Sequence, residues 1–180
     1  MNFIDCVKNR RSIRKFKDEP VDHDTFKRIV EVAAFSPSWK NAQIARYIVL
    51  EDRALIEEIA ENCVMGYAHN TSIIQKAPAL VLLTYICGRS GYERDGSVST
   101  SKGDQWEMFD AGIAAQTFCL AAHNEGVGTV IMGIFDDQKL QGAIGIPDGQ
   151  KVAAIIAAGY PDEEPAAPKR KTAEELLSFR

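Results

Sequence analysis

The feature that most constrains the fold of this chain is a set of four short apolar segments with the composition of β-strands. Segments with helical periodicity separate them. The strand candidates are residues 47–50, 80–86, 129–132 and 152–156. Among the helical patterns, the one from Phe26 to Ala33 has one apolar face and stops before Pro37, whose ring disfavours helix in the preceding residue. Because no unit is repeated and 180 residues is the size of one domain, we expect a single domain with helices and strands.

A cationic segment near the N-terminus contrasts with the net charge of −4 of the whole chain. Residues 10–16, the basic run, read RRSIRKF and place four cations within six positions. Guanidinium groups grip phosphate oxygens in a fork geometry, and the hydroxyl of Ser12 can bind a further oxygen. A solvated basic turn is the alternative interpretation. Because no other basic face is evident, we expect a compact phosphorylated ligand and no nucleic-acid partner.

The composition also argues against a membrane, secretory or metal-binding role. The apolar stretches that begin at Ala79 and Val152 are far shorter than the roughly 20 residues of a membrane-spanning helix. Acidic Asp5 and the lack of an apolar leader segment predict a cytoplasmic protein. The four cysteines are widely spaced, in no metal-binding or redox pattern, so we expect mostly buried free thiols and no metal site.

An alanine-rich stretch at residues 109–124, FDAGIAAQTFCLAAHN, predicts a helix with an unusually smooth surface. Its small side chains, Gly112 among them, allow a neighbouring element to approach closely. The pattern is typical of a core helix packed against a sheet. A core helix that also builds a subunit interface is the second, compatible interpretation. His123 near the C-terminal end is expected to complement the helix dipole or to lie on the surface.

Two further segments carry groups suited to a planar ligand. Residues 36–43, the aromatic loop, read SPSWKNAQ and combine the ring of Trp39 with the amides of Asn41 and Gln43. Amide groups can hydrogen-bond the edge of a heterocycle, although a polar connector would have a similar composition. The segment GVGTVIMGIFD is a strand candidate flanked by glycines, and its Gly133 would let backbone N–H groups come close to a flat ligand.

The remaining segments indicate a loop and an arm. The charged, glycine-rich and serine-rich stretch from Gly88 to Gly103 predicts a long surface loop. After Gly159 the chain becomes polar and rich in proline, before a short helix that we expect at residues 174–179. This tail has the composition of an arm that lies across another surface, and a frayed terminus is the alternative.

Five motifs, taken in order, resemble those of the nitroreductase family of FMN-dependent oxidoreductases: RRSIR, PSWKNAQ, DAGIAAQTFCLAA, GVGTVIMGIFD and IPDGQKVAAIIAAGYPDEEPAAPKRK. The resemblance extends from about Phe3 to the C-terminal arm. It implies an α+β fold with a central mixed, largely antiparallel sheet surrounded by helices, in a single domain that spans residues 1–180. It also implies an intertwined homodimer, in which the arm, residues 161–180, crosses to the partner subunit.

The matching motifs carry the family's FMN-binding positions onto this chain. The residues expected at the FMN phosphate and the edge of the flavin are Arg10, Arg11, Ser12, Arg14, Arg170 and Lys171. The loop that a second subunit contributes to the same flavin is matched by Pro37, Ser38, Trp39 and Asn41. The segment against the isoalloxazine is matched by Ile131, Met132, Gly133 and Ile134, with a looser match of Asn70 to the pyrimidine edge. The acceptor pocket is expected to be lined by Trp39 and Lys40.

The resemblance implies that hydride from NADH or NADPH passes through bound FMN to a small planar acceptor, such as a nitroaromatic or a quinone, in a ping-pong cycle. FMN would perform the redox chemistry, so no side chain is expected to act as a catalytic acid or base. Two other activities stay open: a flavin-dependent dehydrogenase or oxidase of a small molecule, and a non-catalytic FMN carrier or sensor. The chain has no Gly-x-Gly-x-x-Gly motif, and the choice between NADH and NADPH is open as well.

Overall fold

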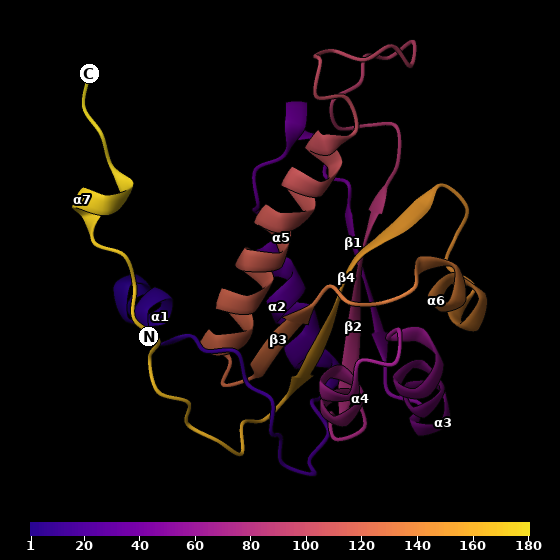
Figure 1. The fold of residues 1–180 in the computed structure, drawn as a ribbon, viewed down its shortest axis with the longest axis vertical. Helices are drawn as coiled ribbons and strands as arrows, with labels where there is room; N and C mark the ends of the chain where they lie inside the picture. The colour runs from indigo at the N-terminus through magenta and orange to yellow at the C-terminus, as the bar shows by residue number, and fades with distance from the viewer.

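The structure, a computed structural model, describes residues 1–180 and is built around a four-stranded sheet (Figure 1). The strands are β1 Ala45–Leu50, β2 Ala79–Ile86, β3 Gly128–Met132 and β4 Gln150–Gly159. They lie in the order β1-β2-β4-β3, and every neighbouring pair is antiparallel. Thus β2 and β4 form the centre of the sheet, and β1 has one edge without a strand partner.

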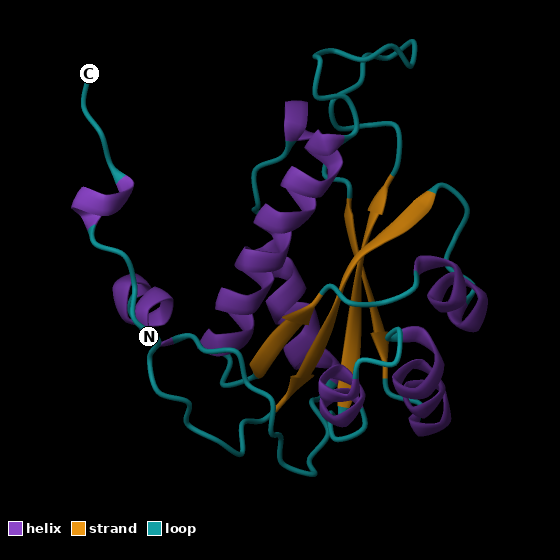
Figure 2. Cartoon of the chain, in the orientation of Figure 1, coloured by secondary structure: helices purple, strands orange, loops and turns teal.

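Helices cover both faces of the sheet (Figure 2). One face carries α2 (His23–Ala33) and the long helix α5 (Gln105–Asn124). The other face carries α3 Arg53–Glu58, its π-helical continuation η2 Ile59–Cys63, α4 Ala68–Ile74 and α6 Asp137–Ile144. Two short helices, α1 (Phe3–Asn9) and α7 (Ala173–Leu176), lie away from the sheet. The expected α+β fold, with a largely antiparallel sheet between helices, is confirmed.

Alternate side chains of the central strand β2 enter two separate cores. Leu80 and Leu82 pack in the layer of α3, α4 and α6, whereas Val81 and Leu83 pack against α2 and α5. All four side chains are buried. Because both faces of the strand exclude water, β2 reads in the sequence as a continuous apolar run and not as an alternating one.

The segment between α1 and α2 is tied to the free edge of β3. The N–H of Ile13 donates to the carbonyl of Thr129 (3.0 Å), and Ser12 forms a parallel bridge with the same residue. Gly128 permits this approach, since a Cβ there would lie 2.8 Å from Cγ1 and 2.9 Å from Cβ of Ile13. The pairing therefore fixes the basic run against β3.

The long helix and the loop before it agree with expectation. The helix expected at residues 109–124 is present and begins earlier, at Gln105. Residues 87–104, the long loop, contain no helix and no strand, which confirms the predicted loop.

Three of the four cysteines are buried and all four are free, as their spacing indicated. None of the helices combines the length and the apolar character that crossing a bilayer requires.

The arm extends away from the body of the domain (Figure 1). Its helix is shorter than the predicted 174–179: α7 ends at Leu176, and Leu177 is extended (φ −114°, ψ 137°). No residue of α7 is buried, and a helical turn without packing is marginal in water. Leu176, Leu177 and Phe179 are all exposed. The arm thus ends in apolar side chains that cover nothing in their own chain.

We expect Gly128→Ala to lower the free energy of unfolding by about 1–3 kcal/mol, because the new Cβ would overlap the branched Cβ of Ile13. Gly142→Ala in α6 is the control, since a Cβ there meets no atom within 4 Å and alanine favours helix. Urea denaturation measures both variants. Equal unfolding free energies would contradict the close approach of Ile13 to β3.

Candidate functional site

The basic run begins at the C-terminal end of α1. Arg10 is the C-cap of that helix, and Arg11 Nη1 donates to the carbonyls of Lys8 (2.7 Å) and Arg10 (3.0 Å). Arg14 Nη1 donates to the carbonyl of Ser12 (3.2 Å). The side chains of Arg10, Arg11 and Ser12 are half-buried, and that of Arg14 is exposed. Cationic and hydroxyl donors therefore stand side by side along the edge of β3.

Two residues outside the predicted set also belong to this region. Glu163 Oε1 accepts the backbone N–H of Arg14 (2.5 Å). His123, at the end of α5, is half-buried, and burial together with the positive charges of Arg10 and Arg11 lowers its pKa. The lowered pKa disfavours the cationic form that would complement the helix dipole, and the partial exposure of the side chain agrees better with the alternative of a surface histidine.

The last two residues of β3 and the two that follow, residues 131–134, form an open apolar ledge, here called the β3 ledge. Ile131 and Ile134 are 46% and 43% exposed although both are apolar, whereas Met132 points into the core. A Cβ at Gly133 would meet no protein atom within 4 Å, so nothing inside the chain requires glycine there. The backbone N–H groups of Gly133 and Ile134 donate to no backbone acceptor. Asn70 of α4 is buried and donates Nδ2 to the carbonyl of Ile134 (3.4 Å), which brings it to the ledge.

The aromatic loop lies at the other end of α5. It contains a short 3-10 turn, η1 (Trp39–Asn41), whose first N–H donates to Asp110 Oδ2 (2.9 Å). Lys40, Asn41 and Gln43 have left-handed backbone angles, with φ of 45°, 56° and 48°. Such angles cost free energy in residues that carry a Cβ, and they occur where tight packing or function requires them.

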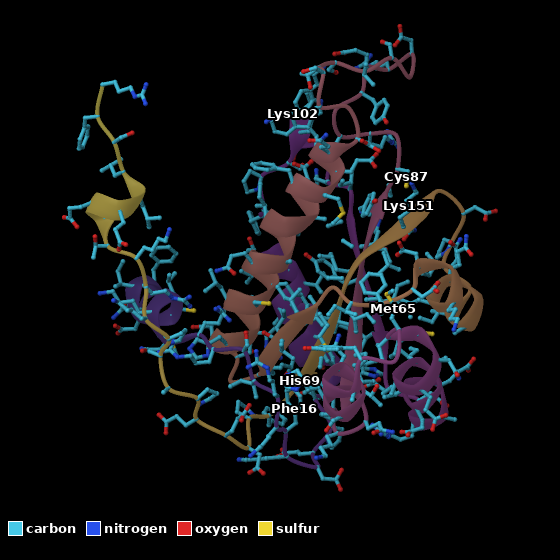
Figure 3. All side chains as sticks on the ribbon, in the orientation of Figure 1. Phe16, Met65, His69, Cys87, Lys102 and Lys151 are labelled. Carbon is cyan, nitrogen blue, oxygen red and sulfur yellow. The ribbon has the colours of Figure 1, made fainter.

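Aromatic and charged contacts join the aromatic loop to the long loop and to α5. The rings of Trp39 and Trp106 lie 4.9 Å apart between centroids, and Lys40 Nζ pairs with the carboxylate of Glu93 at 2.8 Å. Lys102 Nζ lies 5.2 Å from the ring centroid of Trp106, and Figure 3 shows Lys102 at the N-terminal end of α5. The expected acceptor-pocket residues therefore sit among contacts that the sequence did not single out.

The expected cofactor residues fall in three separate places of one chain. The first place is the edge of β3, where the basic run, Asn70 and residues 131–134 lie. The second is the N-terminal end of α5, where residues 37–41 lie. The third is the exposed arm, which carries Arg170 and Lys171. Cys6 of α1 donates to the carbonyl of Leu120 (3.4 Å), ten residues beyond Asp110. About 15 Å of helix therefore separates the two anchor points on α5.

A groove of about 880 Å³ lies between α2 and the unpaired edge of β1. Apolar side chains form much of its wall, among them Phe26, Val30, Tyr47 and Val49. Residues 36–38 and Gln43 of the aromatic loop also line it, but no residue of the basic run or of the β3 ledge does. The groove is therefore separate from the basic run and from the β3 ledge.

Asp110 and Glu163 were missed by reasoning from the sequence. Asp110 is the only charged residue from Phe109 to Ala122, so a helix expected to be largely buried contains a single carboxylate. This isolated charge was a signal in the sequence that could have identified Asp110. Glu163 stands in an acidic stretch of the tail, and nothing in its sequence setting distinguishes it from a solvated charge.

The groups beside β3 suit a phosphorylated planar ligand. Cations and a hydroxyl beside β3 suit a phosphate, and the open face at Gly133 suits a flat ring.

Comparisons with known proteins show the family of this chain. The family model described as "Nitroreductase family" matches residues 7–71 and 66–160. A putative NADH dehydrogenase/NAD(P)H nitroreductase of Methanothermobacter thermautotrophicus is 28% identical over 169 residues, which cover 92% of this chain and 80% of that protein.

Solved structures give the same result. A nitroreductase family protein from Clostridium novyi NT has 30% identity and a TM-score of 0.77, and the match covers 91% of this chain and 87% of that one. A putative nitroreductase from Desulfovibrio desulfuricans, solved in complex with FMN, has 25% identity and a TM-score of 0.78. The match covers 100% of this chain and 98% of that one. With the family model matched from residue 7 to residue 160, the chain belongs to the nitroreductase family.

Proposed function

We propose that this protein is an FMN-dependent oxidoreductase that takes hydride from NADH or NADPH and reduces a small planar acceptor, such as a nitroaromatic or a quinone. The observation that carries the proposal is the β3 ledge, where a glycine with open space and free N–H donors adjoins a cationic segment. A relative named NAD(P)H nitroreductase supports the electron donor, and the FMN complex of a neighbour supports the cofactor.

The residues of the proposed site have separable roles. Arg10 and Ser12 would hold the phosphate of FMN by charge-assisted hydrogen bonds. The N–H groups of Gly133 and Ile134 would face the ring, and Asn70 keeps the Ile134 backbone in place through its bond to the carbonyl. Bound FMN supplies the two-electron chemistry. The N–H donors and nearby cations would stabilise negative charge at the ring, which would be the protein's contribution to the rate.

The exposed position of the β3 ledge supports a broad range of acceptors. A flavin that lies on the ledge would have its opposite face uncovered by the ledge, and the apolar side chains of Ile131 and Ile134 provide no hydrogen bond that would select one substituent pattern. Electron donor and acceptor would occupy that opposite face in turn, which is the physical basis of a ping-pong cycle.

The length of α5 supports a homodimer with FMN at the interface. The basic run and the aromatic loop are anchored near Leu120 and at Asp110, about 15 Å apart on one helix. If two copies of α5 pack antiparallel about a two-fold axis, the aromatic loop of one chain comes beside the basic run of the other. The outer stripe of α5 suits such packing, because Phe109 is 58% exposed and a Cβ at Gly112 meets no atom within 4 Å.

The groove beside β1 supports the crossing of the arm, residues 161–180, to a second subunit. An unpaired strand edge and an apolar wall favour an extended segment with apolar side chains. The arm has such a segment at Leu177 to Phe179. We therefore propose the groove of the partner as the place of the arm's end, with Arg170 and Lys171 carried toward an FMN phosphate.

Arg10→Ala and Ser12→Ala should each weaken FMN binding by about 1–3 kcal/mol, or roughly tenfold to a hundredfold in dissociation constant, because each removes a charge-assisted hydrogen bond. Lys17→Ala is the matched control, since it removes a nearby cation outside the proposed site. Flavin fluorescence titration of the apoprotein measures all three. Unchanged affinity in a double variant, Arg10→Ala with Arg14→Ala, would remove the phosphate assignment.

The FMN-loaded protein should oxidise NADH or NADPH steadily in the presence of a quinone or a nitroaromatic. Gly133→Val should abolish this turnover, because its side chain fills the space left for the ring, and the melting temperature should change little, since that space contains no protein atom. Gly142→Ala serves as the active control. Turnover in Gly133→Val would place the flavin elsewhere. Tight FMN binding without turnover in the wild-type protein would favour a carrier or sensor.

Removal of residues 165–180 should weaken FMN binding and expose the groove, because Arg170, Lys171 and the apolar end are lost together. The shortened chain still contains Asp162, so the hydrogen bond from the N–H of Asp162 to the carbonyl of Lys15 (3.0 Å) is retained. Light scattering measures the assembly state, and FMN titration measures binding.

Gly112→Leu tests the outer stripe of α5 by the same two measurements and should give a folded monomer. A monomeric wild-type protein that binds FMN tightly and turns over would contradict the homodimer.

A further inference from the structure

Asp110 is a buried carboxylate that the proposed chemistry does not use. It lies in the second turn of α5 and is 4% exposed. Its Oδ2 accepts both the backbone N–H of Trp39 (2.9 Å) and the hydroxyl of Ser90 (2.5 Å), and Ser90 is itself buried. Taking a carboxylate out of water is costly unless hydrogen bonds compensate. Both compensating bonds come from loops, which points to a role in holding those loops.

The aromatic loop depends on outside contacts for its shape. Lys40, Asn41 and Gln43 have left-handed backbone angles, which persist only where neighbouring groups hold them. Inside the loop, Ser38 Oγ accepts the N–H of Gln43 (2.9 Å). From outside, Asp110 binds the N–H that begins the 3-10 turn. Loss of that acceptor leaves the strained turn without its hydrogen bond to α5.

The same carboxylate oxygen joins the aromatic loop to the long loop. Ser90 belongs to the long loop, and the ion pair of Lys40 with Glu93 links the same two segments. The ring contact of Trp39 with Trp106 joins the aromatic loop to α5 itself. The side chains of Lys40 and Glu93 are 58% and 47% exposed, and ion pairs this exposed contribute little. The buried contact at Asp110 is therefore the stronger polar tie between the two loops.

Glu107, one turn earlier on α5, provides a matched comparison. It is also 4% exposed, and its Oε1 accepts the backbone N–H of Gly88 (2.5 Å). Its hydrogen bond goes to the start of the long loop alone. Removing each carboxylate in turn therefore separates the anchoring of the long loop from the anchoring of the aromatic loop.

We propose that Asp110 is a positioning residue that sets the aromatic loop for FMN binding, acting through the backbone N–H of Trp39. The consequence for FMN rests on the proposed function, whereas the placement of the loop does not require a flavin. The loop needs an acceptor atom at this point, and an amide oxygen supplies one. Asp110→Asn should therefore keep the loop in place, and Asp110→Leu, which has a similar shape but no acceptor, should release it.

Hydrogen exchange of the flavin-free protein tests the loop directly. In Asp110→Leu we expect the amides of residues 38–43 to exchange about tenfold faster or more, with the amides of β2 and β4 unchanged. In Asp110→Asn and in Glu107→Leu the same amides should exchange as in the wild type. The near-ultraviolet circular dichroism of the Trp39–Trp106 pair should change in Asp110→Leu alone. If Asp110→Leu does not fold, Asp110→Ala replaces it in every measurement.

FMN titration of the same proteins tests the consequence. Asp110→Leu should bind FMN about tenfold more weakly or worse, while Asp110→Asn and Glu107→Leu stay close to the wild type. Unchanged exchange at residues 38–43 in the variant without an acceptor overturns the positioning role. Faster exchange with unchanged FMN affinity overturns its link to the flavin. A wild-type protein that binds no FMN refutes the proposed function instead, and the exchange result alone then decides the role of Asp110 in the loop.

Discussion

The fixed length of α5 is the constraint on which the arrangement of the site depends. Ala111, Ala115, Phe118 and Ala122 bury this helix against the sheet and α2, so it cannot bend or slide without losing close packing. One end holds the aromatic loop and the other end contacts α1. The distance between two segments suited to one ligand is thereby set by a rigid element.

The two edges of the sheet have different partners. The edge of β3 is covered by the basic run, and only a glycine at position 128 lets Ile13 approach closely enough for its N–H to reach Thr129. The edge of β1 is free of strands and borders an apolar groove. Unpaired edges are prone to pairing with other chains, and the apolar end of the arm is the segment of this protein suited to cover one. One edge thus carries the candidate site, and the other borders the apolar groove.

Buried polar groups gather where loops meet regular elements. Asn70 binds the β3 ledge, while Glu107 and Asp110 bind the two loops around the N-terminal half of α5. Most of the other buried side chains on both sides of the sheet are apolar. Apolar burial therefore contributes most of the free energy of folding, whereas a few hydrogen bonds fix the geometry of the loops. This division allows a substitution at Asp110 to move a loop without unfolding the sheet.

The sequence by itself determined the local elements: four apolar runs became strands, the alanine-rich stretch became α5, and RRSIRKF followed α1. Periodicity and turn residues report such features because they depend on neighbours along the chain. Strand order was not available, since β2 is apolar on both faces and its pattern favours no partner. Only the tertiary structure brought Asn70 to Ile134, 64 residues away, and Asp110 to Trp39, because contacts between distant segments are decided by how the whole chain packs.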